Sequence, residues 1–229
     1  MKHFDELEKK LNVDFKNKDL LMQSFAHRSY INENPGFHLA NNERLEFLGD
    51  AVIELVVTEE LFLTYPENPE GDLTNWRASL VNAKMLSQVA KELHFEDFLF
   101  LSKGERKENG KARSYILANC FEAFVGALYL DLGYEKAKEF LKKVLLSRLD
   151  GIIKGGLYKD AKSTFQEKAQ EKVSITPLYK VMKEWGPDHN KRFVVGVYLN
   201  DTLVSEGEGS SKQEAEEEAA KSALKIKNW

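Results

Sequence analysis

The chain has 229 residues, of which 42% are hydrophobic and 31% charged, so it is long enough for one large or two modest folded domains and too apolar to be disordered. Its formal net charge of −4 does not by itself indicate a nucleic-acid-binding protein, so any such binding must come from local patches. A single cysteine, Cys120, excludes an intramolecular disulfide and favours a reducing cytoplasm. The charged N-terminus does not resemble a signal peptide, and we expect no membrane-spanning segment.

Helical periodicity dominates the chain up to about residue 149, and residues 42–56 predict an amphipathic helix. Its predicted core-facing stripe is formed by Leu45, Leu48, Val52, Leu55 and Val56. Glu43, Glu46 and Asp50 gather within roughly 60° on the opposite side. Like charges this close destabilise a bare helix, so they indicate either a solvated acidic face or a site for a hard divalent cation. Phe47 also falls on the acidic side, where an exposed aromatic residue indicates a subunit interface.

The second informative segment, residues 115–130, is apolar nearly all round and predicts a buried helix. Asn119 and Glu122 are its strongly polar residues and share one face, three positions apart. A buried carboxylate is costly unless it is paired, protonated or bound to a metal. Pairing of Glu122 with Arg44 or Arg77 is one explanation. The other is a site for Mg²⁺ or Mn²⁺, because both helices offer only oxygen ligands.

The C-terminal part of the chain has a different pattern. Glycines in residues 151–159 predict a linker. Beyond it we expect a helix at 161–171, strands at 178–185, 192–199 and 202–207, and a helix that begins at Ser211. Asn200-Asp201 predicts the hairpin turn between the last two strands. Ser211 and Glu214 form a capping-box pattern ahead of a stripe of alanines at 215, 219 and 223.

These segments resemble one known family. Residues Asn42 to Asp50, with the sequence NERLEFLGD, match the signature nonapeptide of ribonuclease III. Further matching segments, in the same order, are Ala26–Tyr30 (AHRSY), Glu70–Leu73 (EGDL) with Arg77 and Val81, and Phe121–Ala123 (FEA). Because the resemblance extends over essentially the whole chain, including the C-terminal part, the chain is identified as a member of the bacterial ribonuclease III family.

The resemblance implies a multi-domain fold. An all-α endonuclease domain at 1–150 would work as a homodimer, followed by the linker and by a small α+β double-stranded-RNA-binding domain at 160–229 with the order α-β-β-β-α. The implied activity is Mg²⁺-dependent cleavage of double-stranded RNA, with Mn²⁺ as a substitute, which leaves 5′-phosphate and 3′-hydroxyl ends and short 3′ overhangs. The implied roles are the processing of ribosomal and messenger RNA precursors and RNA decay, in the cytoplasm.

Residue by residue, the resemblance implies metal ligands at Glu46, Asp50, Asn119 and Glu122, with Asp50 and Glu122 catalytic. One position departs from the family, which usually has an aspartate where this chain has Asn119. Asparagine still offers a carbonyl oxygen to Mg²⁺, but it removes one negative charge and cannot act as a base.

Other residues receive supporting or structural roles. The resemblance implies that Glu43 and Glu70 are accessory acids lining a valley between subunits, and that Phe47 inserts into the partner subunit. His27 lies in a family motif, but we expect a hydrogen-bonded structural role for it rather than general-base catalysis. We expect Cys120 to be inert and buried.

Acidic and basic residues are almost equally numerous after residue 160. The prediction of RNA binding therefore depends on where particular polar residues lie and not on an excess of basic residues. Neutral polar groups on one helix face suit the 2′-hydroxyls of a shallow minor groove, and a helix N-terminus suits phosphates. The candidate RNA-binding residues are Ser163, Gln166, Gln170, His189, Ser211 and Lys212. Many family members have a second lysine where this chain has Gln213, which should lower its affinity.

Two functions remain open at this point. The first is an endoribonuclease. The second is a double-stranded-RNA-binding protein with reduced or absent cleavage because of Asn119. A helical metal protein unrelated to RNA is a weaker third interpretation, since the C-terminal domain argues against it.

Overall fold

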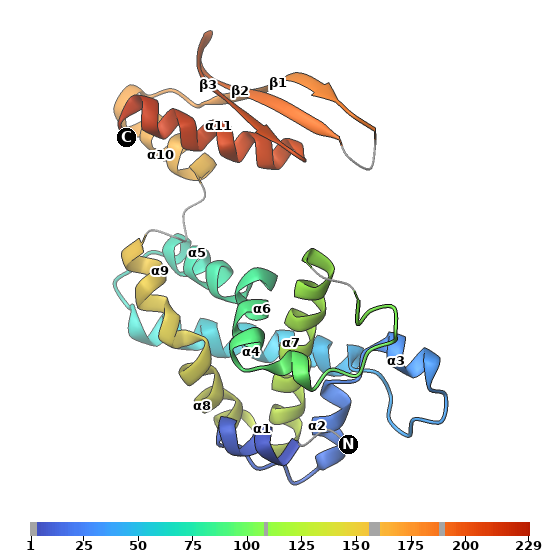
Figure 1. Ribbon diagram of the computed structural model, residues 1–229. Coiled ribbons are helices and arrows are strands. Elements are labelled where there is room, and N and C mark those ends of the chain that lie inside the picture. Colours follow the sequence, from blue (N-terminus) through green and yellow to red (C-terminus); the bar gives the residue numbers. More distant parts are fainter. Residues whose placement is uncertain (1–3, 108–109, 156–160, 188–190) are drawn as a thin grey trace. The chain divides into compact units, whose positions relative to one another are not determined.

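The chain folds into two compact units, Met1–Tyr158 and Lys159–Trp229 (Figure 1). The structure is a computed structural model, which describes residues 4–107, 110–155, 161–187 and 191–229. Each unit has its own hydrophobic core. The first unit is helical and the second combines helices with a three-stranded sheet, which confirms the predicted fold class.

The first unit consists of helices of very different lengths. They are α1 (Phe4–Leu11), α2 (Lys18–Ser24), α3 (Arg28–Glu33), α4 (Glu43–Thr64), α5 (Glu70–Val81), α6 (Ala83–Glu92), α7 (Lys111–Leu132), α8 (Tyr134–Val144) and α9 (Leu149–Gly155), with 3-10 turns at Phe95–Asp97 and Leu146–Arg148. Asparagine side chains cap two of them: Asn17 begins α2 and Asn82 begins α6, each accepting backbone N–H bonds.

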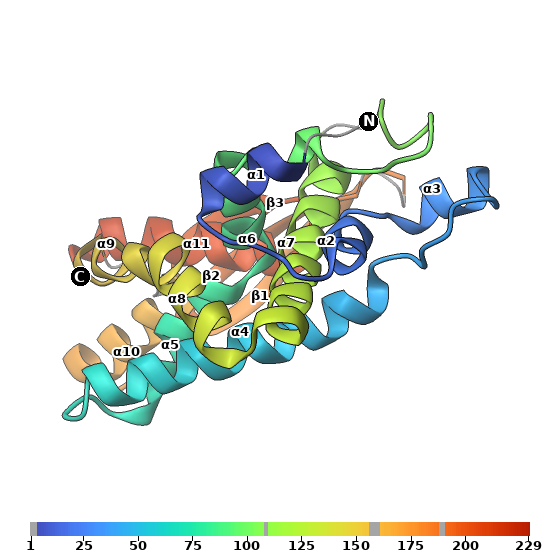
Figure 2. The ribbon, with the colours of Figure 1, turned by 90° about the horizontal axis from the view of Figure 1, so that it is seen from below.

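Helix α7 forms the centre of this core, and helices α2, α4, α6 and α8 pack around it (Figure 2). Its apolar residues from Leu117 to Leu128 are almost all buried, as predicted for this segment. Phe124 of α7 lies 5.1 Å from Phe95, ring centre to ring centre, and Phe95 lies at the same distance from Phe25. This aromatic cluster joins three parts of the chain that are distant in sequence.

The stretch Ala112–Leu132 of α7 is long and apolar enough to cross a membrane by length and composition, which the sequence analysis did not anticipate. More than half of it is buried inside the unit. Because neighbouring helices cover it, its hydropathy is that of the core helix of a helical domain.

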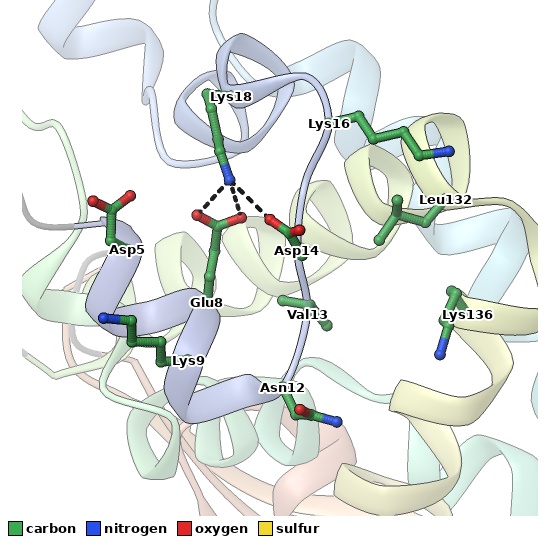
Figure 3. A pocket seen from close by; sticks show the side chains of 10 residues that line it. All are labelled: Asp5, Glu8, Lys9, Asn12, Val13, Asp14, Lys16, Lys18, Leu132 and Lys136. Atoms are coloured by element: carbon green, nitrogen blue, oxygen red, sulfur yellow. Dashed lines mark hydrogen bonds and ion pairs between the residues drawn. The ribbon is translucent and has the colours of Figure 1, made fainter.

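The N-terminal segment is fastened by a buried acid. Glu8 of α1 accepts hydrogen bonds from the Phe15 N–H at 2.8 Å and from the Lys18 ammonium at 2.7 Å. Lys18 also lies 3.3 Å from Asp14, and these groups border a hollow between α1 and the C-terminal end of α7 (Figure 3). The glutamate therefore closes the turn between α1 and α2.

The sequence analysis misplaced the linker and part of one stripe. Residues 151–155, predicted to be linker, belong to α9, where Ile152 is buried in the helical core because an apolar side chain there outweighs the helix-weakening glycines. The rest of the predicted linker, residues 156–159, lies outside the described residues. Leu55, predicted to face the core, is 57% exposed, whereas Ile53 and Val57 are buried.

The second unit packs two helices on one face of its sheet (Figure 1). Its elements are α10 (Ala161–Val173), β1 (Leu178–Trp185), β2 (Arg192–Leu199), β3 (Thr202–Gly209) and α11 (Lys212–Lys227), and the antiparallel strands lie in the order β1-β2-β3. The predicted turn at Asn200-Asp201 is confirmed, with Asn200 in the left-handed region at φ 52°. The alanine stripe of α11 is fully buried against the sheet.

Candidate functional site

The closest approach in the helical unit is the crossing of α4 and α7 (Figure 2). A Cβ built on Gly49 would stand 1.7 Å from the Glu122 carbonyl oxygen, and one built on Gly126 would stand 2.2 Å from the Leu45 carbonyl oxygen. The backbones therefore touch at two glycines, which permits a separation that side chains would prevent. This contact fixes which residues of the two helices face each other.

The polar residues predicted from the sequence meet beside this crossing. Glu46 and Asp50 of α4 lie close enough to Glu122 of α7 to act on its charge, and the Asn119 side chain hydrogen-bonds Glu46. Asp50 is exposed, whereas the other three are half-buried. The structure thus brings together the four residues predicted as metal ligands, although their roles stay predictions.

Ionisation of this cluster is opposed by its surroundings. Burial, together with the charges of Asp50 and Glu46, raises the pKa of Glu122 to about 8. Burial and the nearby Glu43 charge also raise the pKa of Glu46, while the hydrogen bond from Asn119 lowers it. Near neutral pH the cluster must therefore either retain protons or gain a counter-charge.

Oxygen donors from carboxylates and an amide suit a hard cation such as Mg²⁺. Among the described residues, no three His, Cys, Asp or Glu side chains already stand close enough to hold a metal ion. The donor set fits the predicted cation in chemistry and charge. Of the four predicted ligands, Asp50 is the exposed one and has the greatest freedom to turn toward a cation.

Within the described part of the chain, no ion pair with an arginine accounts for the burial of Glu122. Arg77 instead lies 3.2 Å from Glu54 and donates a 3.0 Å hydrogen bond to Thr58. Arg44, the other proposed partner, is exposed on α4. The Arg77 alternative is therefore wrong.

The two predicted accessory acids occupy different places. Glu43 begins α4, lies 3.6 Å from Arg28 and adds its charge to the surroundings of Glu46. Glu70 begins α5 and accepts a 2.8 Å hydrogen bond from Thr74. Within one subunit Glu43 therefore borders the acid cluster, whereas Glu70 lines a separate groove between α4 and α5.

The exposed face of α4 is unusually apolar for a helix surface. Phe47 is 82% exposed, and Leu55 and Phe62 further along the helix are also exposed. The groove between α4 and α5 has an apolar lining that includes Leu61, Phe62 and Leu73. Exposed apolar surface of this extent is typical of an interaction site.

His27 and Cys120 occupy positions that suit structural roles. The His27 ring caps α3 by accepting from the Ser29 N–H and lies 2.8 Å from the Ser29 hydroxyl. Burial lowers the pKa of His27. Cys120 is fully buried. Both observations agree with the roles expected for these residues.

In the second unit, Ser163, Gln166 and Gln170 share an exposed face of α10 and line a shallow hollow, as their spacing predicts. The hollow also contains Glu167 and Glu171, which the sequence analysis did not include. Their carboxylates make this face less favourable to phosphates than the neutral residues alone would suggest.

The N-terminus of α11 holds the other candidates. Ser211 caps the helix by accepting from the Glu214 N–H at 3.1 Å. The Glu214 carboxylate accepts from the backbone N–H of Ser210, rather than closing the predicted reciprocal box with Ser211. Lys212 is exposed, with its ammonium 5.8 Å from the centre of the Phe193 ring, and His189 lies outside the described residues.

Sequence reasoning missed the glycines as site residues. Gly49 and Gly126 have no side chain to offer a ligand, but they determine the distance between the two pairs of acid-cluster residues. Their signal in the sequence was a glycine inside each of two long apolar helices, which indicates a close backbone approach.

A helical unit with a half-buried acid cluster, followed by a helix–sheet–helix unit, defines a class of two-domain nucleic-acid enzymes, and comparison with known proteins agrees. The family model "Ribonuclease-III-like" matches residues 17–149, and "Double-stranded RNA binding motif" matches residues 161–227. The chain belongs to the ribonuclease III family. This confirms the predicted family and its enzyme class, an endoribonuclease.

Similar proteins of nearly equal length are known. Ribonuclease 3 of Enterococcus faecalis is 43% identical over 221 residues, which cover 96% of this chain and 95% of the relative. Ribonuclease 3 of Nitratiruptor sp. is 44% identical over 226 residues, which cover 99% of this chain and 97% of the relative.

The helical unit also resembles solved structures. The nuclease domain of ribonuclease III from Campylobacter jejuni is 41% identical, with a TM-score of 0.57, and the match covers 63% of this chain and 94% of that domain. A second structure of that domain concerns structural flexibility in the region involved in dimer formation. It is 40% identical, with a TM-score of 0.57, and the match covers 62% of this chain and 95% of that domain.

Proposed function

We propose that this chain is a Mg²⁺-dependent endonuclease that cleaves double-stranded RNA. The observation that carries the proposal is the meeting of Glu46, Asp50, Asn119 and Glu122 at the α4–α7 crossing, in a chain that also has a double-stranded RNA binding motif. Relatives of nearly equal length named Ribonuclease 3 support it.

The acid cluster has the properties that phosphodiester hydrolysis needs. When bound, Mg²⁺ would polarise the phosphoryl group and offset the charge that develops on it, and Mn²⁺ would substitute. Glu46, Asn119 and Glu122 would hold the cation, and Asp50 would hold it or orient a water toward the phosphorus. Water is the nucleophile, because His27 and Ser29 are engaged in capping α3.

Glu122 is placed to exchange a proton when a cation binds or leaves. With its pKa raised to about 8, it is largely protonated at neutral pH until a cation binds nearby. The same pKa allows it to accept a proton as a cation leaves. Hydrolysis is expected to leave 5′-phosphate and 3′-hydroxyl ends with short 3′ overhangs.

The second unit is proposed to hold the substrate through shape rather than sequence. Ser163, Gln166 and Gln170 would meet a minor groove, while Lys212 and the N-terminus of α11 would meet phosphates. His189 is retained as a candidate from the sequence alone. Because Gln213 is uncharged and Glu214 is acidic, we expect modest affinity with weak salt dependence.

We further propose a homodimer joined through α4. Phe47, at 82% exposure, is the aromatic anchor, and the apolar groove between α4 and α5 of a second copy is its receptor. This arrangement brings Glu70, which lines that groove, toward the partner's acid cluster, so both accessory acids would border one valley. We propose a cytoplasmic protein that processes ribosomal and messenger RNA precursors and takes part in RNA decay.

The test is cleavage of an end-labelled duplex of about 30 base pairs, close to two footprints of a binding domain. The chain and Asn119→Asp are compared with Mg²⁺ and with EDTA. We expect cuts by the unmodified chain that require Mg²⁺, and faster cutting by Asn119→Asp. Binding without cleavage that Asn119→Asp rescues would instead identify a double-stranded-RNA-binding protein that has lost a ligand.

A further inference from the structure

The sheet of the second unit has one uncovered, partly apolar face. Helices α10 and α11 lie against the face that carries Val195 and Val197 (Figure 1). The opposite face, here called the outer face, carries Leu178, Met182 and Leu203, each between 40% and 50% exposed. Apart from His189, which is outside the described residues, the candidate RNA-binding groups lie on α10 and at the start of α11, so they do not account for this face.

Strand register arranges the outer face in three cross-strand rows. From β1 through β2 to β3 these are Leu178–Tyr198–Leu203, Lys180–Gly196–Glu206 and Lys183–Val194–Glu208. Lys180 and Lys183 therefore stand on β1 and Glu206 and Glu208 on β3, two strands apart within one chain. Glu208 is already paired with Arg192 of β2, at 2.8 Å. Gly196 is buried at the centre of this face, where the side chains of Met182, Leu203 and Tyr198 close over it.

This pattern is complementary to itself. When the outer faces of two copies are stacked by a two-fold rotation about an axis parallel to β2, β1 of the second copy lies over β3 of the first. Each cross-strand row then lies opposite the same row of the other copy. Lys180 then faces Glu206 of the second copy, and Val194 faces its own counterpart. In such an isologous contact each charged pair occurs twice. The Lys180 ammonium, 5.1 Å from the centre of the Tyr198 ring, is already held on this face.

We propose that the outer face is a self-association surface, through which the RNA-binding units of two copies of this chain pack sheet to sheet. The pairing is separate from the α4 interface, so it would link dimers into larger assemblies or join the two RNA-binding units of one dimer.

The area of the outer face indicates how stable the contact between two copies would be. Strand spacing and rise give roughly 300–400 Å² per copy. This area is below the ~800 Å² per partner of a stable complex, so the contact is weak by itself. It becomes effective where RNA or the α4 dimer raises the local concentration of the units.

The test uses the full chain without RNA and a short bismaleimide cross-linker. Val194→Cys places a thiol beside the proposed two-fold axis. Val173→Cys, at an exposed valine at the end of α10, is the matched control, and the unmodified chain, with Cys120 buried, gives the background. We expect Val194→Cys to form covalent dimers about ten-fold faster than Val173→Cys, because a symmetric contact holds the two thiols together.

Charge reversal then tests the predicted pairing. Lys180→Glu and Glu206→Lys should each slow cross-linking of Val194→Cys about five-fold, since each puts like charges together at two places. The double variant should restore the rate, because the swapped charges again face opposite ones. Unchanged thermal unfolding of each variant serves as the folding control. Equal rates for Val194→Cys and Val173→Cys, or a double variant as slow as the single ones, would overturn the proposal.

Discussion

Gly49 of α4 lies directly on the peptide carbonyl of Glu122 in α7, so close that any side chain at position 49 would overlap it. This contact sets the distance between the carboxylates of α4 and the amide and carboxylate of α7. The geometry of the acid cluster therefore depends on a residue without a side chain.

Gly49→Ala should force the two helices apart. Because the added carbon would stand 1.7 Å from backbone, we expect a loss of about 2–3 kcal/mol in the free energy of unfolding and at least ten-fold slower cleavage. Urea denaturation and duplex cleavage measure the two effects. Gly151→Ala in α9 is the control, since its added carbon meets nothing within 4 Å and should slightly stabilise the chain. Equal effects of the two substitutions would contradict this role for Gly49.

Stability without Mg²⁺ should depend on the protonation of Glu122. Its pKa is 4.5 as an ordinary glutamate and about 8 in the folded chain. Between these values the folded chain keeps a proton that the unfolded chain has released, so stability falls as pH rises through this window. Glu122→Gln has no carboxylate to ionise and so does not lose stability in this way. It should raise the free energy of unfolding of the metal-free chain at pH 8 by on the order of 1–3 kcal/mol, a range that allows for the partial solvent exposure of Glu122.

Thermal unfolding in EDTA at pH 5 and pH 8 checks the direction of this pH dependence. The difference between Glu122→Gln and the unmodified chain should be small at pH 5 and large at pH 8. Added Mg²⁺ should stabilise only the unmodified chain at pH 8. A difference that is independent of pH would show that the pKa of Glu122 is not raised.

Charge at the start of α11 should set the affinity for RNA. Lys212→Ala should weaken duplex binding several-fold and reduce the steepness of its salt dependence by about one phosphate contact. Gln213→Lys should have the opposite effect on both quantities. Lys225→Ala, at the other end of the same helix, is the control and should change neither. Electrophoretic mobility shifts at several salt concentrations provide the comparison.

Phe47 should hold two subunits together. Phe47→Ala removes the most exposed large apolar side chain of α4 and should weaken dimerisation by about 2 kcal/mol or more. Sedimentation at low micromolar concentration should then shift toward the monomer mass. Ile226→Ala, which shortens an exposed apolar side chain of α11, should leave the mass unchanged. A Phe47→Ala chain that sediments like the unmodified one would contradict an interface through α4.

Much of this architecture could be predicted because local patterns agree with the fold. Alternation placed β1 and β2 at their observed bounds, and the turn at Asn200-Asp201 follows from residues that tolerate left-handed backbone. The isolated polar pair Asn119 and Glu122 in an apolar helix identified the second half of the acid cluster. These features depend on neighbours in sequence.

The remaining features depend on contacts between distant segments. Leu55 has the periodicity of a core residue, but no helix among the described residues covers that edge of α4, so its side chain is exposed. Ile152 lies in a glycine-containing segment, yet it packs on the helical core and extends the helices past the predicted boundary. The outer face of the sheet became apparent only once register had aligned residues from three strands.

The most direct test of the central claim is single-turnover cleavage of a labelled duplex in Mg²⁺ by the unmodified chain and by Glu122→Gln, with Glu54→Gln as the matched control. Glu54 is on α4, one turn after Asp50, but it pairs with Arg77 and is not among the charges that raise the pKa of Glu46 or Glu122. We predict that Glu122→Gln binds the duplex with unchanged affinity and cleaves it at least a hundred-fold more slowly, on the order of 3 kcal/mol in the barrier, while Glu54→Gln cleaves nearly normally. Undiminished cleavage by Glu122→Gln would contradict the claim that the acid cluster at the α4–α7 crossing is the catalytic centre.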